Sequence, residues 1–596
     1  MNDMTLRTTK LDITGRSPIL NTAAIIINLI AVFLLVKGFH LETNPDAAFY
    51  YQLSGTVLLV ATLISMFVLK GLFLFSYVAR VLVGGLFIVS GLVKANDPWG
   101  FAFKLEEYFE PSGLSYDFPF FESFSGITLE LAVFICIAEI VLGVAVILGG
   151  KIKLASWSLV IMMAFFTWLT SYTHSCGEAA EAAMAAGETF TRQCVNDCGC
   201  FGDALKGSVG RSLTPHESYW KDLVLFYFCL IIFINQWKIR MNTVKENWIL
   251  APASLLVVIF FSWVFGWMFP VIFTIIALLG AFVMANLNIG KIGKAWKMAI
   301  FVTFISVLFG LYTANYLPFK DYRPYAVGNN IGEQMTNGID EVSNGFYVYQ
   351  NKATGEEVRV AQSDWSSEYG DTTKFKYLDW EKEVIVPGVP AAIQVSSVRI
   401  EYDQLSDADK EIPHIDSLIK ADYEMYYEEK MAIYSADYGM DTIPSIDFDT
   451  LYYPDSMYTV KSVFTALIDP STPYGLDLTH YLITTDVVFI MTIRDMASIN
   501  ENSIADFREV LEGAKEKNIP FFVLCSAGQD EIDEFRKKYE LDATYLTMDG
   551  VEIKIIIRSN PGLVLLKKGT VMDKWPSRSV EDFEDIYEDY IQTNEN

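Results

Sequence analysis

Four cysteines lie in one polar segment between two apolar runs: Cys176, Cys194, Cys198 and Cys200. Clustered cysteines can exchange disulfides, form structural disulfides or bind a metal. Only Gly199 separates Cys198 from Cys200, and glycine has the backbone freedom that such a small disulfide ring demands. A strained ring of this kind is oxidising. We therefore predict Cys198 and Cys200 as a redox pair, with Cys176 and Cys194 as a structural disulfide.

This assignment has alternatives, because four cysteines allow three pairings. In one alternative, all four cysteines form disulfides that only stabilise the loop. In another, all four bind zinc, although structural zinc sites usually use two pairs of cysteines spaced two to four residues apart. We expect no metal.

The loop lies within a region of apolar runs. The chain has 596 residues, of which 52% are hydrophobic, and this is too apolar for an ordinary soluble protein. A run of about 20 apolar residues is long enough to cross a bilayer as a helix. The sequence predicts nine membrane-spanning helices, at 20–37, 51–69, 72–93, 127–149, 154–173, 221–238, 249–267, 270–288 and 298–317.

Lysine and arginine in the short connections give the orientation. They occur at the N-terminus and after the second, fourth, sixth and eighth predicted helices, all on one side if the helices alternate. Positive loops face the cytoplasm. We therefore expect a bacterial inner-membrane protein with a cytoplasmic N-terminus and a periplasmic C-terminal part. The cysteine loop, residues 174–220, then faces the periplasm, where disulfides persist.

Two charged residues fall inside predicted spans, Arg80 and Glu139. Both lie some 10–15 Å from the cytoplasmic ends of antiparallel neighbouring helices, at roughly 1.5 Å per residue. Charges inside a membrane normally pair and often mark function. We predict an Arg80–Glu139 ion pair, which serves either as a structural clasp or in binding a quinone head group.

Lys94, Asp97 and Lys104 surround the outer mouth of the third predicted helix. Asp97-Pro98 can cap a following helix, with proline in the first turn. Residues 100–109 then form an amphipathic helix that suits the membrane interface. This motif is either a structural cap or a lid beside the cysteine loop.

The acidity of the chain is confined to its last part. Residues 321–596 hold 52 of the 72 acidic residues and 24 of the 45 basic ones. This excess of negative charge keeps the region soluble and argues against nucleic acid or anionic lipid as its partner. Residues 318–480 contain short strand-like runs, such as 345–350 and 383–387, but their pattern assigns no fold.

Residues 481–596 are clearer. A buried strand at 487–490, a helix at 502–517, a strand at 521–525 and a helix at 529–539 precede a hairpin at 563–574. The segment Arg558-Ser-Asn-Pro-Gly-Leu-Val-Leu-Leu-Lys-Lys-Gly569 resembles the part of thioredoxin that begins at its cis-proline, so the resemblance implies a cis bond before Pro561. Where thioredoxin has Cys-x-x-Cys, this chain reads Thr492-Ile-Arg-Asp-Met-Ala-Ser498. We therefore expect this domain to bind partners and not to exchange disulfides.

The membrane region resembles a second family. The stretch from Phe87 to Phe109 is similar to the signature of DoxX-type proteins. Asp197-Cys-Gly-Cys-Phe-Gly-Asp203, with Lys221-Asp222 further on, is similar to the MauE branch of that superfamily. The resemblance implies a redox role, linked to quinones in DoxX-type proteins and to disulfide-bearing periplasmic partners in MauE-type proteins.

The expected fold is thus an α-helical polytopic domain at 1–317, a mixed region at 318–480 and an α/β thioredoxin-like domain at 481–596. Two functions remain open. The first is a thiol–disulfide oxidoreductase with a quinone cofactor that acts on periplasmic proteins. The second is a non-catalytic subunit for envelope assembly or transport, whose periplasmic domain binds other proteins.

Overall fold

The computed structural model divides the chain into two compact units, Met1–Ala314 with Pro318–Tyr322, and Asn315–Leu317 with Arg323–Asn596. Cys198 and Cys200 lie outside the residues that the structure describes. The described residues are 26–28, 30–35, 37, 45–69, 73–187, 189–195, 199, 201–288, 291–339, 342–366, 369–386, 388–389, 391–393, 399–400, 476–477 and 479–592.

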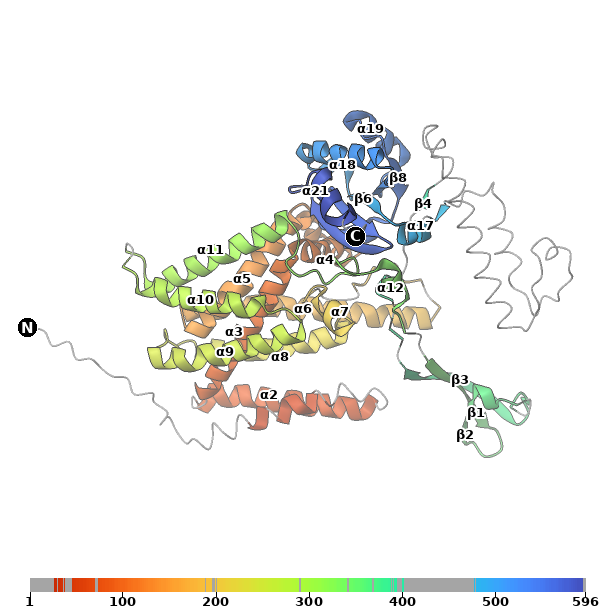
Figure 1. Cartoon of the computed structure of the whole chain (residues 1–596). Helices are drawn as coiled ribbons and strands as arrows, with labels where there is room; N and C mark the ends of the chain where they lie inside the picture. Colours follow the sequence, from red (N-terminus) through yellow and green to blue (C-terminus); the bar gives the residue numbers. More distant parts are fainter. Residues whose placement is uncertain are drawn as a thin grey trace, which may run out of the picture. The chain divides into compact units, whose positions relative to one another are not determined.

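The first unit is a bundle of helices (Figure 1). Its elements are α2 (Pro45–Leu69), α3 (Phe73–Asn96), α4 (Pro98–Phe109), η1 (Leu114–Tyr116), η2 (Pro119–Ile127), α5 (Thr128–Leu148), α6 (Ile152–Ala185), α7 (Ala204–Val209), α8 (Pro215–Asn235), α9 (Val244–Val264), α10 (Phe269–Asn286) and α11 (Lys294–Asn315).

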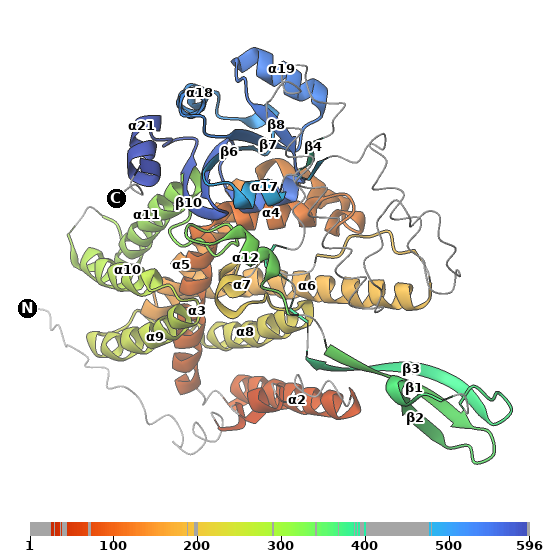
Figure 2. The same ribbon diagram turned by 45° about the vertical axis from the view of Figure 1, so that its right-hand side comes forward.

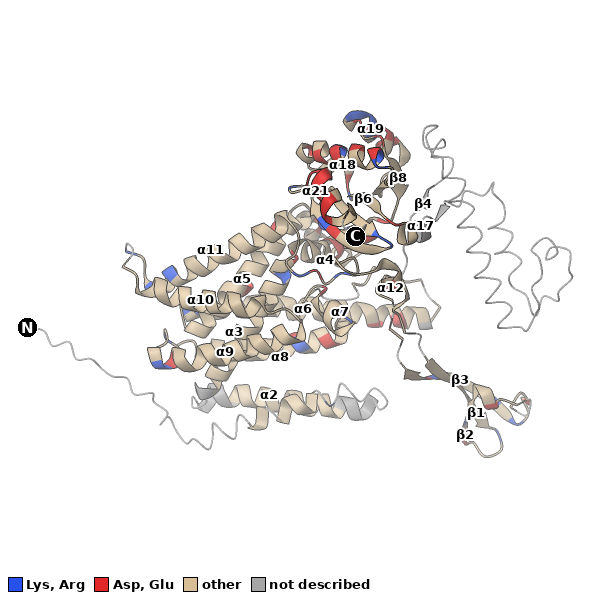
Figure 3. Ribbon diagram, in the orientation of Figure 1, with Lys and Arg blue, Asp and Glu red and all other residues tan. Residues whose placement is uncertain are grey.

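Six helices in the described part of the chain are long and apolar enough to cross a membrane: Phe75–Asn96, Pro119–Leu148, Ile152–Met184, Val244–Val264, Phe269–Asn286 and Lys294–Asn315. Charged side chains are sparse along these helices in Figure 3. The other three predicted spans fall on α2, α8 and the segment Ile26–Leu35, so the total of nine stays a prediction.

Helices α3 and α5 approach closely at small residues. A Cβ atom at Gly91 would lie 2.8 Å from the carbonyl oxygen of Cys136, and one at Gly143 would lie 2.8 Å from that of Gly84. Small residues let membrane helices pack with their backbones in contact. This packing brings the C-terminal half of α3 against the middle of α5.

Helix α4 follows α3 after one residue. Asp97 is its N-cap and accepts a hydrogen bond from the Gly100 amide at 3.0 Å, with Pro98 in the first turn, as the sequence suggested. Its apolar face, which includes Phe101, Leu105 and Tyr108, is buried against the bundle.

The second unit contains two sheets. The smaller is antiparallel, in the order β2 (Glu357–Ala361), β1 (Val342–Asn351) and β3 (Phe375–Val386). The larger has the order β10 (Thr570–Pro576), β9 (Gly562–Lys567), β6 (Val488–Ile493), β7 (Phe521–Cys525), β8 (Thr544–Thr547), β4 (Arg399–Ile400) and β5 (Leu476–Asp477).

Strands β6, β7 and β8 of the larger sheet are parallel, and β9 runs antiparallel to β6. Figure 2 shows β6, β7 and β8 side by side. Every residue of β6 is buried: Val488 and Ile490 belong to one core cluster, and Phe489 and Met491 to the other. A strand buried on both faces needs helices on both sides. The α-helices in the described part of this unit are α12 (Ile331–Thr336), α17 (Thr479–Thr484), α18 (Ile504–Glu516), α19 (Gln529–Tyr539), α20 (Gly550–Ile556) and α21 (Phe583–Ile586).

Candidate functional site

A buried ion pair joins α3 to α5. Lys94 Nζ lies 2.6 Å from Glu139 Oε1, and both side chains are 4% exposed. Nζ also donates a hydrogen bond to Ser90 Oγ at 2.9 Å. The rings of Phe101 and Phe166 lie 5.4 and 5.5 Å from it. Because a buried charge without a partner is strongly destabilising, each member of this pair stabilises the other.

The predicted Arg80–Glu139 ion pair is therefore wrong. Arg80 donates hydrogen bonds to the carbonyl oxygens of Val146 and Ile147, each at 2.9 Å, and to Asn242 Oδ1 at 2.6 Å. Side chains on a helix tilt toward its N-terminus. On α3 this tilt points Arg80 away from Glu139, toward the carbonyl oxygens of Val146 and Ile147 in the last turn of α5. The same tilt directs the ammonium of Lys94, which lies further along α3, back toward Glu139.

Lys94 also lines a cavity of about 970 Å³ within the first unit. Its walls are mostly aromatic and aliphatic. Phe109 stacks on Phe121 with ring centroids 5.8 Å apart, and Phe121 stacks on Trp168 at 6.1 Å. Other lining residues include Leu105, Phe118, Phe134, Ala138, Leu142, Ile161, Phe165 and Leu169.

Few polar groups line this cavity. Besides Lys94, they include Ser158, Thr170 and Asp222. Asp222 is 2% exposed; its Oδ1 accepts a hydrogen bond from Lys221 Nζ at 2.7 Å, whereas its buried Oδ2 has no hydrogen-bond partner. An apolar pocket with a few placed polar groups is the usual form of a small-molecule site.

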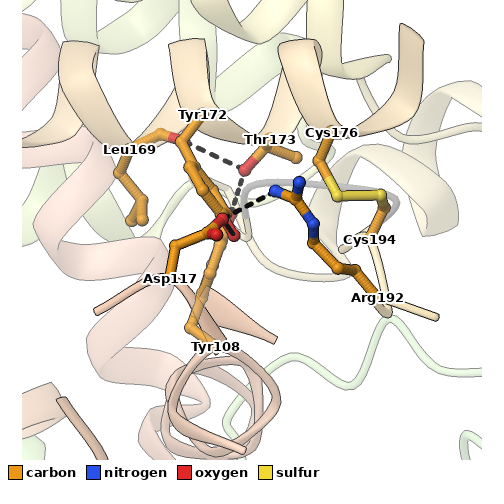
Figure 4. Close-up of a disulfide and its surroundings, with 8 residues drawn as sticks. All are labelled: Tyr108, Asp117, Leu169, Tyr172, Thr173, Cys176, Arg192 and Cys194. Carbon is orange, nitrogen blue, oxygen red and sulfur yellow. Dashed lines mark hydrogen bonds and ion pairs between the residues drawn. A yellow bond between two sulfur atoms is a disulfide. The ribbon is translucent and has the colours of Figure 1, made fainter. Parts of the chain in front are cut away.

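Two residues of the cavity wall, Tyr108 and Leu169, lie near the disulfide of the cysteine loop (Figure 4). Cys176, near the end of α6, forms a disulfide with Cys194, with Cα atoms 5.6 Å apart. This is the pairing predicted from the sequence for these two cysteines. Thr173 lies on α6 one turn before Cys176, and its hydroxyl group is 3.0 Å from that of Tyr108 on α4. Tyr108 lines the cavity, so α4 and α6 meet between cavity and disulfide.

An ion pair fixes the chain that leads to Cys194. Arg192 Nη1 lies 2.7 Å from Asp117 Oδ2, which also accepts a hydrogen bond from the Tyr172 hydroxyl at 2.9 Å (Figure 4). The Arg192 guanidinium lies 5.5 Å from the Tyr116 ring centroid. These contacts hold the loop against the η1 segment.

Cys198 and Cys200 are outside the described residues, but their neighbours are placed. Gly199 has φ +61°, and a Cβ atom there would lie 2.9 Å from Cγ of Lys104 on α4. Phe201 packs on Phe265 with ring centroids 5.4 Å apart, and Lys221 Nζ lies 5.2 Å from the Phe201 ring. The backbone between the two predicted redox cysteines therefore touches the helix that covers the cavity.

The three residues of the predicted outer motif have separate roles. Lys94 points inward to Glu139, Asp97 caps α4, and Lys104 pairs with Glu107 at 2.6 Å. They do not meet at one site. Among the described residues there is also no group of three His, Cys, Asp or Glu side chains placed to hold a metal ion.

In the second unit, the Asn560–Pro561 bond is cis, as the resemblance implied. The adjoining Asn560 side chain binds the loop that follows β6, at Arg494 and Asp495. Its Oδ1 accepts a hydrogen bond from the Arg494 amide at 2.9 Å, and its Nδ2 donates one to the Asp495 carbonyl at 2.7 Å. An amide side chain thus occupies this loop, and the loop has no thiol.

Cys525, at the end of β7, is fully buried. Burial raises the pKa of its thiol to about 11, so the thiol stays protonated at neutral pH. Because the thiolate is the reactive form, Cys525 is a packing residue.

Sequence reasoning named Asp222 only as part of a family resemblance and missed its position in the cavity wall, together with most of the aromatic wall. A signal for Asp222 was present, since a carboxylate begins the otherwise apolar run of α8. The wall left no such signal, because its residues come from α4, η2, α5 and α6, and each is an ordinary apolar residue in its own helix.

Six apolar helices and a buried intramembrane ion pair define a multi-pass membrane protein. Residues 72–181 match the family model of methylamine utilisation protein MauE. This domain spans α3 to most of α6 and contains Lys94, Glu139 and Cys176. Neither a curated protein nor a solved structure matches the chain.

Proposed function

We propose that this protein is an inner-membrane thiol–disulfide oxidoreductase that acts on periplasmic proteins and passes electrons to a quinone. The observation that carries the proposal is the aromatic cavity of about 970 Å³ beside the cysteine loop, with Lys94 in its wall. The MauE domain is consistent with a redox role in the membrane.

The cavity suits a quinone in size, lining and access. Its volume is at the upper end of the range for small-molecule pockets, about 300–1,000 Å³. Flat aromatic walls such as Phe121 and Trp168 can stack on a quinone ring. Phe134 and Ile161 line the cavity and are 65% and 64% exposed, so it opens where a bilayer would supply a lipid-soluble ligand. The Lys94 ammonium would donate a hydrogen bond to a quinone oxygen.

The reaction assigned to the loop is a two-electron exchange. The thiols of Cys198 and Cys200 form a disulfide and release two electrons and two protons, and the quinone takes up both to become a quinol. The disulfide then oxidises a dithiol of a partner protein by thiol–disulfide exchange. Gly199, between the two cysteines, contacts α4, and α4 lines the cavity. This contact supports electron transfer from the cysteines to a quinone in the cavity.

The topology of the proposal follows the positive-inside pattern, with nine spans, a cytoplasmic N-terminus and loop 174–220 in the periplasm. The DoxX-like stretch, Phe87 to Phe109, belongs to the membrane domain at 1–317. Regions 318–480 and 481–596 would then lie in the periplasm. A thioredoxin-like fold for the second region is supported by its sheet, in which β6, β7 and β8 are parallel, β9 is antiparallel to β6, and β10 is antiparallel to β9. The cis bond before Pro561 agrees with this fold. Without cysteines at 492–498, this region would hold the partner.

A quinone-reduction assay with a cavity-filling variant tests this function. The pre-reduced protein in lipid nanodiscs should convert a short-chain quinone to quinol. Ala138→Trp, which fills the cavity, should abolish this conversion, whereas Leu279→Trp, on the lipid-exposed face of α10, should leave it unchanged. Equal rates in Ala138→Trp and wild type would refute the cavity as the acceptor site.

A second candidate is a non-catalytic assembly or transport subunit. The observation that favours it is the cysteine-free loop at Arg494 and Asp495, held by Asn560, because it excludes disulfide exchange by the second unit. In that case the loop disulfides are structural. Pre-reduced protein would then convert no quinone in the same assay.

A further inference from the structure

One oxygen of Asp222 is the unexplained atom of the cavity. Asp222 lines the cavity and is 2% exposed, and its Oδ1 is bound to Lys221. Its Oδ2 is buried and has no hydrogen-bond partner. A buried carboxylate oxygen without a donor destabilises the protein, so such an atom calls for a ligand or another explanation.

The chemistry of that oxygen restricts the ligand. A carboxylate only accepts hydrogen bonds, so the group that satisfies Oδ2 must be a donor. The ion pair with Lys221 at 2.7 Å accounts for the other oxygen alone. Lys94, elsewhere in the same wall, is a donor and suits an acceptor atom. The cavity thus presents a donor at one place and an acceptor at another.

The two forms of a quinone differ in this respect. A quinone has two carbonyl oxygens, which only accept, whereas a quinol has two hydroxyl groups, which also donate. Lys94 can bond an oxygen of either form, but Asp222 Oδ2 can bond only the hydroxyl of the quinol.

We propose that Asp222 accepts a hydrogen bond from a hydroxyl group of bound quinol, so that the cavity binds quinol more tightly than the matching quinone. This inference rests on the proposed function, since it takes the ligand to be a quinone. It adds that Asp222 sets the preference between the two redox forms. Tighter binding of quinol makes the bound quinone a stronger oxidant than the free one.

Binding measurements on the full-length protein in nanodiscs test the proposal. A short-chain 1,4-quinone and its quinol, under anaerobic conditions, are titrated separately by isothermal titration calorimetry. The wild type should bind quinol about 10-fold more tightly or better, the ratio expected for one hydrogen bond to a charged group. Asp222→Asn should lose this preference by weakening quinol binding and should leave quinone binding unchanged.

Two controls keep the result interpretable. Glu181→Gln removes a carboxylate from an exposed position near the end of α6 and should keep the wild-type ratio. Retained quinone binding by Asp222→Asn shows that this variant folds.

Each remaining outcome contradicts one of the two ideas. Equal affinities in the wild type, or an unchanged preference in Asp222→Asn, would overturn the role of Asp222 and leave the proposed function standing. Failure of both quinone and quinol to bind the wild type, with only phospholipid found in the purified protein, would overturn the proposed function as well.

Discussion

Lys94 and Glu139 form an ion pair of 2.6 Å inside the membrane domain, and Arg80, the other intramembrane cation considered, takes no part in it. Lys94 lies in the wall of the aromatic cavity. Lys94 therefore has two roles in this account: it neutralises Glu139, and it offers a donor to the ligand.

Removing one member of the pair should destabilise the protein. Lys94→Met leaves the Glu139 carboxylate buried without a partner, and such losses are about 3–5 kcal/mol for buried pairs. The double variant Lys94→Met/Glu139→Leu should recover most of the loss, because neither charge remains. Thermal unfolding in detergent measures both. If the double variant were as unstable as the single one, the pair would not account for the effect.

A double-mutant cycle tests the choice of partner. Glu139 should couple strongly to Lys94 and not to Arg80, since residues without shared partners usually add within about 0.5 kcal/mol. Arg80→Leu should still lower stability, because it removes the hydrogen bonds from the guanidinium to the carbonyl oxygens of Val146 and Ile147. A large Arg80–Glu139 coupling would contradict the structure.

Much of the second unit follows from its sequence. Residues 502–517 and 529–539 carry apolar residues at helical spacing, and 521–525 is a continuous apolar run, so α18, α19 and β7 occur close to the predicted bounds. Strand β8 was missed because Thr544–Thr547 is short and polar at both ends. Its strand conformation depends on parallel pairing with β7, which is a tertiary contact.

The candidate site was less predictable. The clustered cysteines and the intramembrane charges were visible, but partner choice depends on the direction in which each side chain leaves its helix. For that reason, Glu139 was assigned to Arg80 in error. The cavity could not be predicted, because it exists only where α4, α5 and α6 pack with a gap between them.

The Cys176–Cys194 disulfide should stabilise the loop that it closes. It closes a loop with a sequence separation of 18, and a loop of that size contributes about 3 kcal/mol by the chain-entropy estimate. Cys176→Ser, Cys194→Ser and the double variant should therefore lose similar stability. Unfolding of all three, with non-reducing mass mapping, checks this. Additive losses in the double variant would show that the cysteines do not act as one bond.

The start of α8 should respond to acid. The hydrogen bonds from Arg211, at 2.7 and 2.8 Å, lower the pKa of Glu217 from 4.5 to about 2. A lowered folded-state pKa means that the stabilisation is present above pH 4.5 and is lost as the pH falls toward 2.

A matched variant isolates this effect. The stability difference between wild type and Glu217→Gln should be constant above about pH 5 and shrink as the pH falls from 4.5 to 2. A difference independent of pH across that window would exclude the ion pair as its source.

Thiol labelling should distinguish the cysteines of the loop from the buried Cys525. Cys525 is fully buried and its thiol pKa is raised to about 11, so a maleimide reagent should not label it in the native protein at pH 7. After mild reduction, Cys198 and Cys200 should be labelled. Rapid labelling of native Cys525 would show that β7 is not packed as described.

The most direct test is the redox state of Cys198 and Cys200 in the presence of a quinone. Reduced full-length protein in nanodiscs is mixed with a short-chain quinone, and all thiols are then mapped by differential alkylation and mass spectrometry. The proposed function predicts a Cys198–Cys200 disulfide and one quinol for each disulfide formed, with the Cys176–Cys194 bond unchanged throughout. If all four cysteines instead stay in bonds that resist mild reduction, or re-form them at the same rate without quinone, the protein is not a quinone-linked oxidoreductase.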